Sequence, residues 1–93
     1  MPKFNIETLE GNCPVQAMGD IDGMRFYFRA RGNGWYLSVA KDDGEACGPN
    51  PVFNYSETYS DDPYAAGWMT EDEASMLILE AASKYFLWKI TNI

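Results

Sequence analysis

The chain has 93 residues, of which 46% are hydrophobic and 15% aromatic, and its formal net charge at pH 7 is −7. This length suits one domain with its own core, and the composition excludes a disordered chain. No apolar run approaches the roughly 20 residues of a membrane span, and no apolar segment near the start is typical of a secretory signal. We therefore expect a cytoplasmic protein with no membrane-bound state.

The first predicted elements in chain order are strands. Residues 4–9 alternate loosely between apolar and polar side chains and predict a strand that ends in Gly- and Pro-containing residues 11–14. Residues 15–21 predict a second strand. Asp22-Gly23 follows it, and this dipeptide is typical of a two-residue hairpin turn.

The clearest strand pattern lies in the next segment. Residues 24–30 alternate strictly, with Met, Phe, Phe and Ala on one face and Arg, Tyr and Arg on the other. Asn33-Gly34 then predicts a hairpin turn, because both residue types tolerate a positive φ. Residues 35–40 continue the apolar alternation. We predict a three-stranded antiparallel meander over residues 15–40.

Residues 41–69 are rich in Asp, Gly and Pro and predict a long acidic loop. A short strand is expected inside this loop, from Val52 to Tyr55 or as far as Tyr59. A helix is predicted over residues 70–86, because Thr70 and Glu73 have the spacing of a capping box. Residues 86–90 fit either the end of this helix or a last strand.

The predicted helix carries a broad apolar stripe that should cover the apolar face of the sheet. Its seam comprises Ala74, Leu77, Ile78, Ala81 and Tyr85, widened by Met76, Leu79 and Ala82. The expected fold is therefore a single α+β domain over residues 1–93. It has a three- to five-stranded antiparallel sheet with one C-terminal helix packed on its apolar face.

Catalysis and metal binding are not expected. The chain contains no histidine, so its serines lack the usual base and its two cysteines, Cys13 and Cys47, cannot complete a four-ligand zinc site. The two cysteines could form one disulfide, but reduced thiols suit a cytoplasmic protein better. No Gly-rich phosphate loop opens a helix. We expect a non-enzymatic protein without a cofactor.

Acidic residues concentrate after residue 40. No Lys or Arg occurs between Asp42 and Ser83, a segment with ten carboxylates. Such a surface either binds a basic protein surface built for nucleic acid or is simply a solvated face, with some acids serving the helix start. The residues that we expect to bind a protein partner are Glu57, Tyr59, Asp61, Asp62, Tyr64, Glu71, Asp72 and Glu73. Trp68, if exposed among them, would be a further anchor.

A basic and aromatic patch is expected on the other face of the meander. Arg25, Tyr27 and Arg29, with Arg31 and Tyr36 nearby, could bind a small ligand or a partner, or could pair with acids of the loop or helix. Direct binding of nucleic acid would also use stacking and charge, but the net charge opposes it.

Several segments of the chain resemble those of small uncharacterised proteins from bacteria and their phages. The segments are residues 14–16, 22–23, 26–32, Trp35 and residues 67–74. In size, acidity and lack of catalytic motifs the chain is also similar to anti-CRISPR proteins, which implies an inhibitor or adaptor but carries over no residue roles. The alternative is a chromosomal housekeeping domain that uses the Arg/Tyr face. We expect a monomer or a homodimer.

Overall fold

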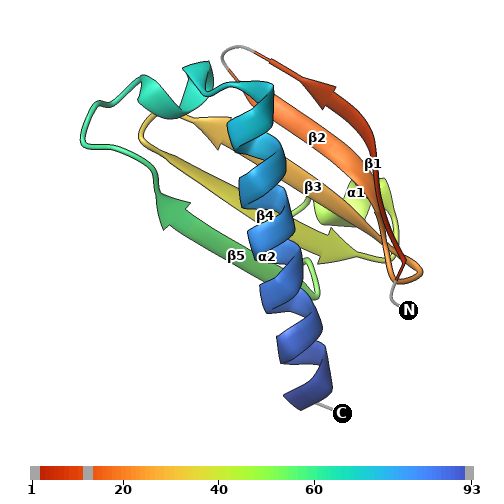
Figure 1. The fold of residues 1–93 in the computed structure, drawn as a ribbon. Coiled ribbons are helices and arrows are strands. Elements are labelled where there is room, and N and C mark those ends of the chain that lie inside the picture. Colours follow the sequence, from red (N-terminus) through yellow and green to blue (C-terminus); the bar gives the residue numbers. More distant parts are fainter. Residues whose placement is uncertain (1–2, 12–13, 92–93) are drawn as a thin grey trace.

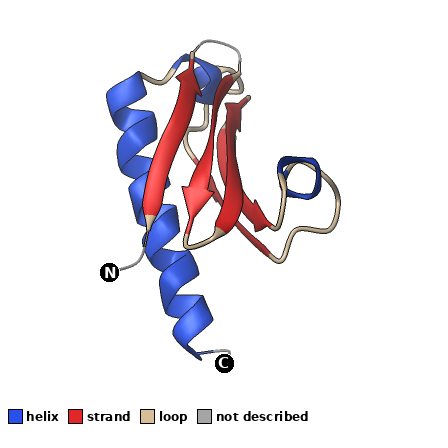
Figure 2. Ribbon diagram, turned by 90° about the vertical axis from the view of Figure 1, so that its right-hand side faces the viewer, coloured by secondary structure: helices blue, strands red, loops and turns tan. Residues whose placement is uncertain are grey.

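Five antiparallel strands and a long C-terminal helix make up the fold in the computed structural model, which describes residues 3–11 and 14–91. The elements are β1 (Phe4–Glu10), β2 (Val15–Ile21), β3 (Met24–Arg31), β4 (Gly34–Ala40), α1 (Asp43–Ala46), β5 (Phe53–Thr58), the 3-10 helix η1 (Ala65–Trp68) and α2 (Glu71–Thr91). The sheet order is β1-β2-β3-β4-β5. Helix α2 crosses one face (Figure 1), and α1 lies against the other (Figure 2). The expected α+β meander with a C-terminal helix is confirmed.

The main core lies between α2 and the sheet face that it covers. Phe26 and Phe28 of β3 and Leu37 of β4 are fully buried there, against Ile78 and Tyr85 of α2. Each large apolar side chain buried in this way contributes about 1.5–3 kcal/mol to folding. The period-two alternation of β3 and β4 is what brings these side chains to the same face.

The hairpin between β3 and β4 turns one residue earlier than predicted. Arg31 pairs with Gly34, so the turn residues are Gly32 and Asn33, and Gly32 has the positive φ of 67°. A glycine with positive φ at the first turn position is typical of a type II′ hairpin. The faces of the strands remain as predicted, because moving the turn by one residue shifts the pairing by two. The Asp22-Gly23 turn is confirmed, since both residues have positive φ and Ile21 pairs with Met24.

A β-bulge interrupts the pairing of β1 with β2. Ile6 pairs with Gly19 and Thr8 with Met18, so Glu7 is an extra residue. Glu7 follows Ile6 in the ordinary alternation, so its carboxylate lies on the sheet face opposite α2, where it binds Arg25. The extra residue lets Leu9 return to the core face, where Phe4 and Ile6 also pack. Gly19 suits this irregular pairing, because a Cβ there would lie 1.9 Å from the carbonyl oxygen of Asn5.

The segment predicted as an acidic loop, residues 41–69, contains three short elements. Helix α1 begins at an N-cap, Asp42, whose carboxylate accepts a 2.8 Å hydrogen bond from the amide of Glu45. Ala46 of α1 packs with Tyr27 and Ala40 in a second small core on the face away from α2. Strand β5 is close to the short strand expected between Val52 and Tyr59.

Helix α2 is longer than the predicted helix over residues 70–86, and it continues to Thr91. Residues 86–90 are helical because their side chains still contact the sheet and one of its turns. The ring of Trp88 lies 5.4 Å from that of Phe53, and Lys89 pairs with Asp22 at the β2–β3 turn. Within the described residues, no helix is both long and apolar enough to span a membrane.

The predicted apolar stripe of α2 was partly wrong. Ala74, Ile78, Ala81, Ala82 and Tyr85 are buried, and Leu77 packs at the core margin. By contrast, Met76 and Leu79 are exposed. A helix on a single sheet can bury only one side, and these two residues lie on the opposite side.

Candidate partner-binding surfaces

The connection from β5 to α2 forms one end of the molecule, which we call the acidic end. It comprises residues 57–73, which are the end of β5, the connecting segment with η1 and the first turn of α2 (Figure 1). The β3–β4 turn holds it in place, because the carbonyl of Asn33 accepts a 2.7 Å hydrogen bond from the amide of Tyr59 and the carbonyl of Gly32 accepts a 2.9 Å bond from that of Ala66. Ala66 and Met69 are also buried in the main core. The acidic end is therefore anchored at several points.

The start of α2 is a complete capping box. The hydroxyl of Thr70 accepts a 3.1 Å hydrogen bond from the amide of Glu73, and Glu73 accepts a 3.3 Å bond from the amide of Thr70. The hydroxyl of Tyr59 donates a further bond to Glu73. The bonds from Tyr59 and from the Thr70 amide lower the pKa of Glu73, because they stabilise its ionised form. Glu73 is thus a structural acid as well as a surface charge.

Two large aromatic side chains protrude from the acidic end. Tyr64 is 72% exposed and Trp68 is 62% exposed. Asp61, Asp62, Glu71 and Asp72, which flank them in the chain, are exposed too. The loop around Tyr64 has a defined shape, because the carboxylate of Asp62 accepts a 2.9 Å hydrogen bond from the amide of Tyr64. The two exposed rings therefore lie beside four exposed carboxylates, on a loop whose shape is fixed in part by Asp62.

The carboxylates of the acidic end are not neutralised by basic side chains of the part of the chain that the structure describes. Ion pairs in that part involve Arg25 and Lys89. Glu57 instead accepts a hydrogen bond from the hydroxyl of Tyr55, which raises the pKa of that tyrosine. The expected acids Glu57, Asp61, Asp62, Glu71, Asp72 and Glu73 therefore all belong to this end and lack a cationic partner within residues 3–11 and 14–91.

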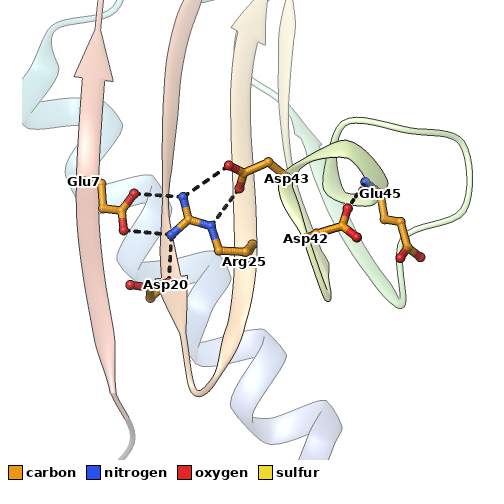
Figure 3. A network of polar contacts seen from close by, with 6 residues as sticks. All are labelled: Glu7, Asp20, Arg25, Asp42, Asp43 and Glu45. Atoms are coloured by element: carbon orange, nitrogen blue, oxygen red, sulfur yellow. Dashed lines mark hydrogen bonds and ion pairs between the residues drawn. The ribbon is translucent and has the colours of Figure 1, made fainter.

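The acids that precede β5 lie elsewhere. Asp42, Asp43 and Glu45 belong to α1 and its cap, on the sheet face away from α2. Asp43 forms an ion pair with Arg25 (Figure 3). Nine of the ten carboxylates after Ala40 therefore form two groups rather than one, and the acidic end is the larger of the two. The tenth, Glu80, lies apart from both on α2.

Arg25 is the centre of an ion cluster on the sheet face that bears α1 (Figure 3). Its guanidinium contacts both carboxylate oxygens of Glu7 at 2.8 Å, Asp20 at 2.7 Å and Asp43 at 2.7 Å. These bonds, with that of Glu7 largest, raise the pKa of Arg25 further above its ordinary value. The cluster joins β1, β2, β3 and α1, so Arg25 has a structural role.

Tyr27, the next expected residue, is also held inside the protein. It is buried beneath α1, and its hydroxyl donates a 2.7 Å hydrogen bond to the side chain of Gln16. Arg29 is different, because its guanidinium has no carboxylate partner among the described residues and Tyr36 lies near it. Of the three expected residues Arg25, Tyr27 and Arg29, only Arg29 remains free to bind.

A groove runs along β4 and β5 on this face. Its first part has a volume of about 400 Å³ and is lined by side chains and backbone of Arg29, Arg31, Asn33, Gly34, Trp35, Tyr36, Ser56, Glu57 and Thr58. Its second part, of about 390 Å³, shares Tyr36 and Ser56 and ends at Gly48, Pro49 and Pro51. The pKa of Tyr36 is raised by burial and by nearby Tyr27, and the charge of Arg29 offsets only part of this rise. The sequence pattern indicated Arg29 and Tyr36, but it gave no sign that Ser56 and Thr58 of β5 lie beside them.

The described residues contain no group of three or more Cys, His, Asp or Glu side chains placed to hold a metal ion. Cys47 is exposed as a residue, and partial desolvation of its thiol, followed by the charge of Asp43, raises its pKa. The possible disulfide with Cys13 lies outside the described residues. Comparison of the chain with protein-family models, with curated proteins and with solved structures found no match.

Proposed function

We propose that this protein is a non-enzymatic binding module whose acidic end docks onto a basic surface of a protein partner. The observation that carries this proposal is the exposure of Tyr64 and Trp68 among carboxylates that have no cationic partner within the described residues. Tyr and Trp are the residues most often found at the energetic centres of interfaces. The surrounding carboxylates would attract a basic partner and orient it.

The anchoring of the acidic end favours binding of this kind. Its backbone is hydrogen-bonded to the β3–β4 turn, and Tyr59 is bonded to Glu73. Less conformational entropy is then lost when a partner binds. A rigid array of carboxylates could occupy a groove that evolved for phosphates, and the protein would then act as an inhibitor of a nucleic-acid-binding protein or as an adaptor, as anti-CRISPR proteins do.

The test is affinity capture from a lysate of the native host with matched variants of the full chain. Asp61→Asn combined with Asp72→Asn removes two charges from the acidic end, and Glu10→Gln combined with Glu45→Gln removes two charges elsewhere. We expect the first pair, and Trp68→Ala alone, to reduce capture of a basic protein about tenfold. The second pair should leave capture unchanged.

Salt dependence provides the second readout of the same experiment. Capture through the acidic end should weaken steeply as ionic strength rises, and nucleic acid should compete with it. Capture that is equal for both charge-matched variants, or that does not change between low and moderate salt, would contradict the proposal.

A second candidate function is supported by the groove along β4 and β5 on the sheet face away from α2. Arg29 and Arg31 line it without a carboxylate partner in the described part of an acidic protein, and the hydroxyls of Tyr36, Ser56 and Thr58 lie along it. This chemistry suits a small phosphate-bearing ligand. Chemical-shift titration with nucleoside monophosphates tests it: Arg29→Gln should abolish the shifts at β4 and β5, whereas Asp61→Asn should not.

A further inference from the structure

Helix α2 has a second apolar stripe that faces solvent. Met76, Leu79, Leu87 and Ile90 are 70%, 53%, 60% and 69% exposed. At about 100° per residue, all four lie within roughly 40° of the direction of Ser83. The buried residues Ala74, Ala81 and Tyr85 lie on the opposite side of the helix. The stripe is therefore separate from the face that packs on the sheet.

Exposed apolar residues scattered over a surface need no explanation, but four that share one side of a helix, with Ser83 at their centre, are typical of an interface. The stripe extends over the last turns of α2, which project past the ends of the strands (Figures 1 and 2). No other element of the described chain covers these side chains, because all four are more than half exposed. A partner that covers this stripe would have to present a long apolar surface to the helix.

The spacing of the stripe matches that of a second copy of itself. Met76 and Ile90 lie equally far before and after Ser83, and so do Leu79 and Leu87. If two α2 helices run antiparallel and cross at Ser83, each Met76 meets Ile90 of the other copy and each Leu79 meets Leu87. The small side chain of Ser83 allows close approach at the crossing point.

The charges beside the stripe complement each other in the same arrangement. Glu80 and Lys84 lie on one flank of α2, and both are exposed. Neither forms an ion pair within the described residues. Around a two-fold axis at Ser83, Glu80 of one copy lies beside Lys84 of the other, which gives two ion pairs per dimer.

The orientation follows from the remaining charges. Glu71, Asp72 and Glu73 crowd the first turn of α2. A parallel pair would place these two acidic turns together, whereas an antiparallel pair separates them at opposite ends and aligns the helix dipoles favourably. For these reasons we propose that the protein forms an antiparallel homodimer through the Met76–Ile90 stripe of α2, independently of what the acidic end binds.

Sedimentation equilibrium of the full chain tests the association. We expect a dimer whose dissociation constant rises at least about tenfold in Leu79→Glu and in Leu87→Glu. Val52→Glu replaces an exposed apolar side chain outside the stripe and should leave the dimer unchanged. Circular dichroism identifies any variant that fails to fold, and Ile90→Glu in the last turn then replaces it. A wild-type chain that remains a monomer at millimolar concentration overturns the proposal, as does a dimer that withstands all three stripe variants.

Two further experiments test the orientation. Lys84→Glu should weaken the dimer, and adding Glu80→Lys to it should restore association, because the swap recreates both ion pairs. In a chain with Cys13→Ser and Cys47→Ser, Ser83→Cys should form an intermolecular disulfide on mild oxidation, whereas Met76→Cys should not. Efficient crosslinking of Met76→Cys to itself would show a parallel pair and overturn the antiparallel arrangement.

Discussion

The hydroxyl of Tyr59 donates a 2.7 Å hydrogen bond to Oε2 of Glu73, and this bond joins the residue after β5 to the first turn of α2. It spans the acidic end and makes one structural unit of a loop and a helix start. The bond raises the pKa of Tyr59 and lowers that of Glu73. Both shifts follow from the preference of the bond for a protonated phenol and an ionised carboxylate.

Removal of the phenol should change the titration of Glu73. In Tyr59→Phe we expect the pKa of Glu73 to rise toward the ordinary range of glutamate, and NMR of the side-chain carboxyl measures it. The lowered pKa in the wild type means that Glu73 contributes stability above the ordinary glutamate range, and this contribution is lost as the pH falls through the lowered value. A Glu73 titration that is identical in both proteins would show that the bond does not form.

Gly19 should not tolerate a side chain. A Cβ there would lie 1.9 Å from the carbonyl oxygen of Asn5 and 2.6 Å from the ring of Phe26. We expect Gly19→Ala to lower the free energy of unfolding by about 3 kcal/mol or more, because a backbone atom cannot move aside without opening the β1–β2 pairing. Urea denaturation measures the loss. Gly11→Ala is the control, since its Cβ would meet nothing within 4 Å, and equal stability of the two variants would contradict the prediction.

The loss of stability caused by removing Arg25 should depend on pH. Arg25→Met leaves Glu7, Asp20 and Asp43 close together without the cation, so we expect about 1–2 kcal/mol of destabilisation at neutral pH, moderated because the carboxylates are half exposed. Acidification removes the repulsion in the variant and the attraction in the wild type. The difference in unfolding free energy between the wild type and Arg25→Met should therefore become smaller at low pH. A difference that does not change with pH would show that the effect comes from packing.

The thiol of Cys47 should react more slowly than a free cysteine. Burial and, second, the charge of Asp43 raise its pKa, and only the thiolate is nucleophilic. In a Cys13→Ser background, we expect the rate of alkylation by iodoacetamide to keep rising with pH above the range of an ordinary thiol. A rate profile that levels off in the ordinary range would contradict this prediction.

Local sequence patterns predicted most of the fold. Strict alternation in residues 24–30 and the Asp22-Gly23 turn determined the faces of β2 and β3, and the capping box of Thr70 and Glu73 determined where α2 begins. The end of α2 could not be predicted, because it depends on contacts of Trp88 with Phe53 and of Lys89 with Asp22 that are distant in sequence. The exposure of Met76 and Leu79, by contrast, follows from the helix period, because at about 100° per residue both lie on the side opposite Ala74.

The candidate surfaces were predictable to the extent that their residues are neighbours in the chain. The acids and aromatics of the acidic end lie within one segment, so the sequence indicated them together. The groove was not predictable, because it forms only when β5 pairs with β4 in the folded sheet. This pairing brings Ser56 and Thr58 beside Arg29. For Arg25, pairing with an acid of residues 41–69 was one of the expectations, and the ion pair with Asp43 fulfils it. The pairs with Glu7 and Asp20 could not be predicted, because they depend on how β1 and β2 lie beside β3.

The order of strands in the sheet is also their order in the chain. The first four strands are joined by short connections, so each can pair with the one before it at a small cost in loop-closure entropy, and β5 adds to β4 after residues 41–52. Pairing between neighbours in sequence favours rapid folding for a β-rich protein. Helix α2 differs from the strands, because its buried residues pack on strands that are distant from it in the sequence. The helix would dock last on a sheet that is already assembled, and a ribosome would release the meander before the residues that cover it.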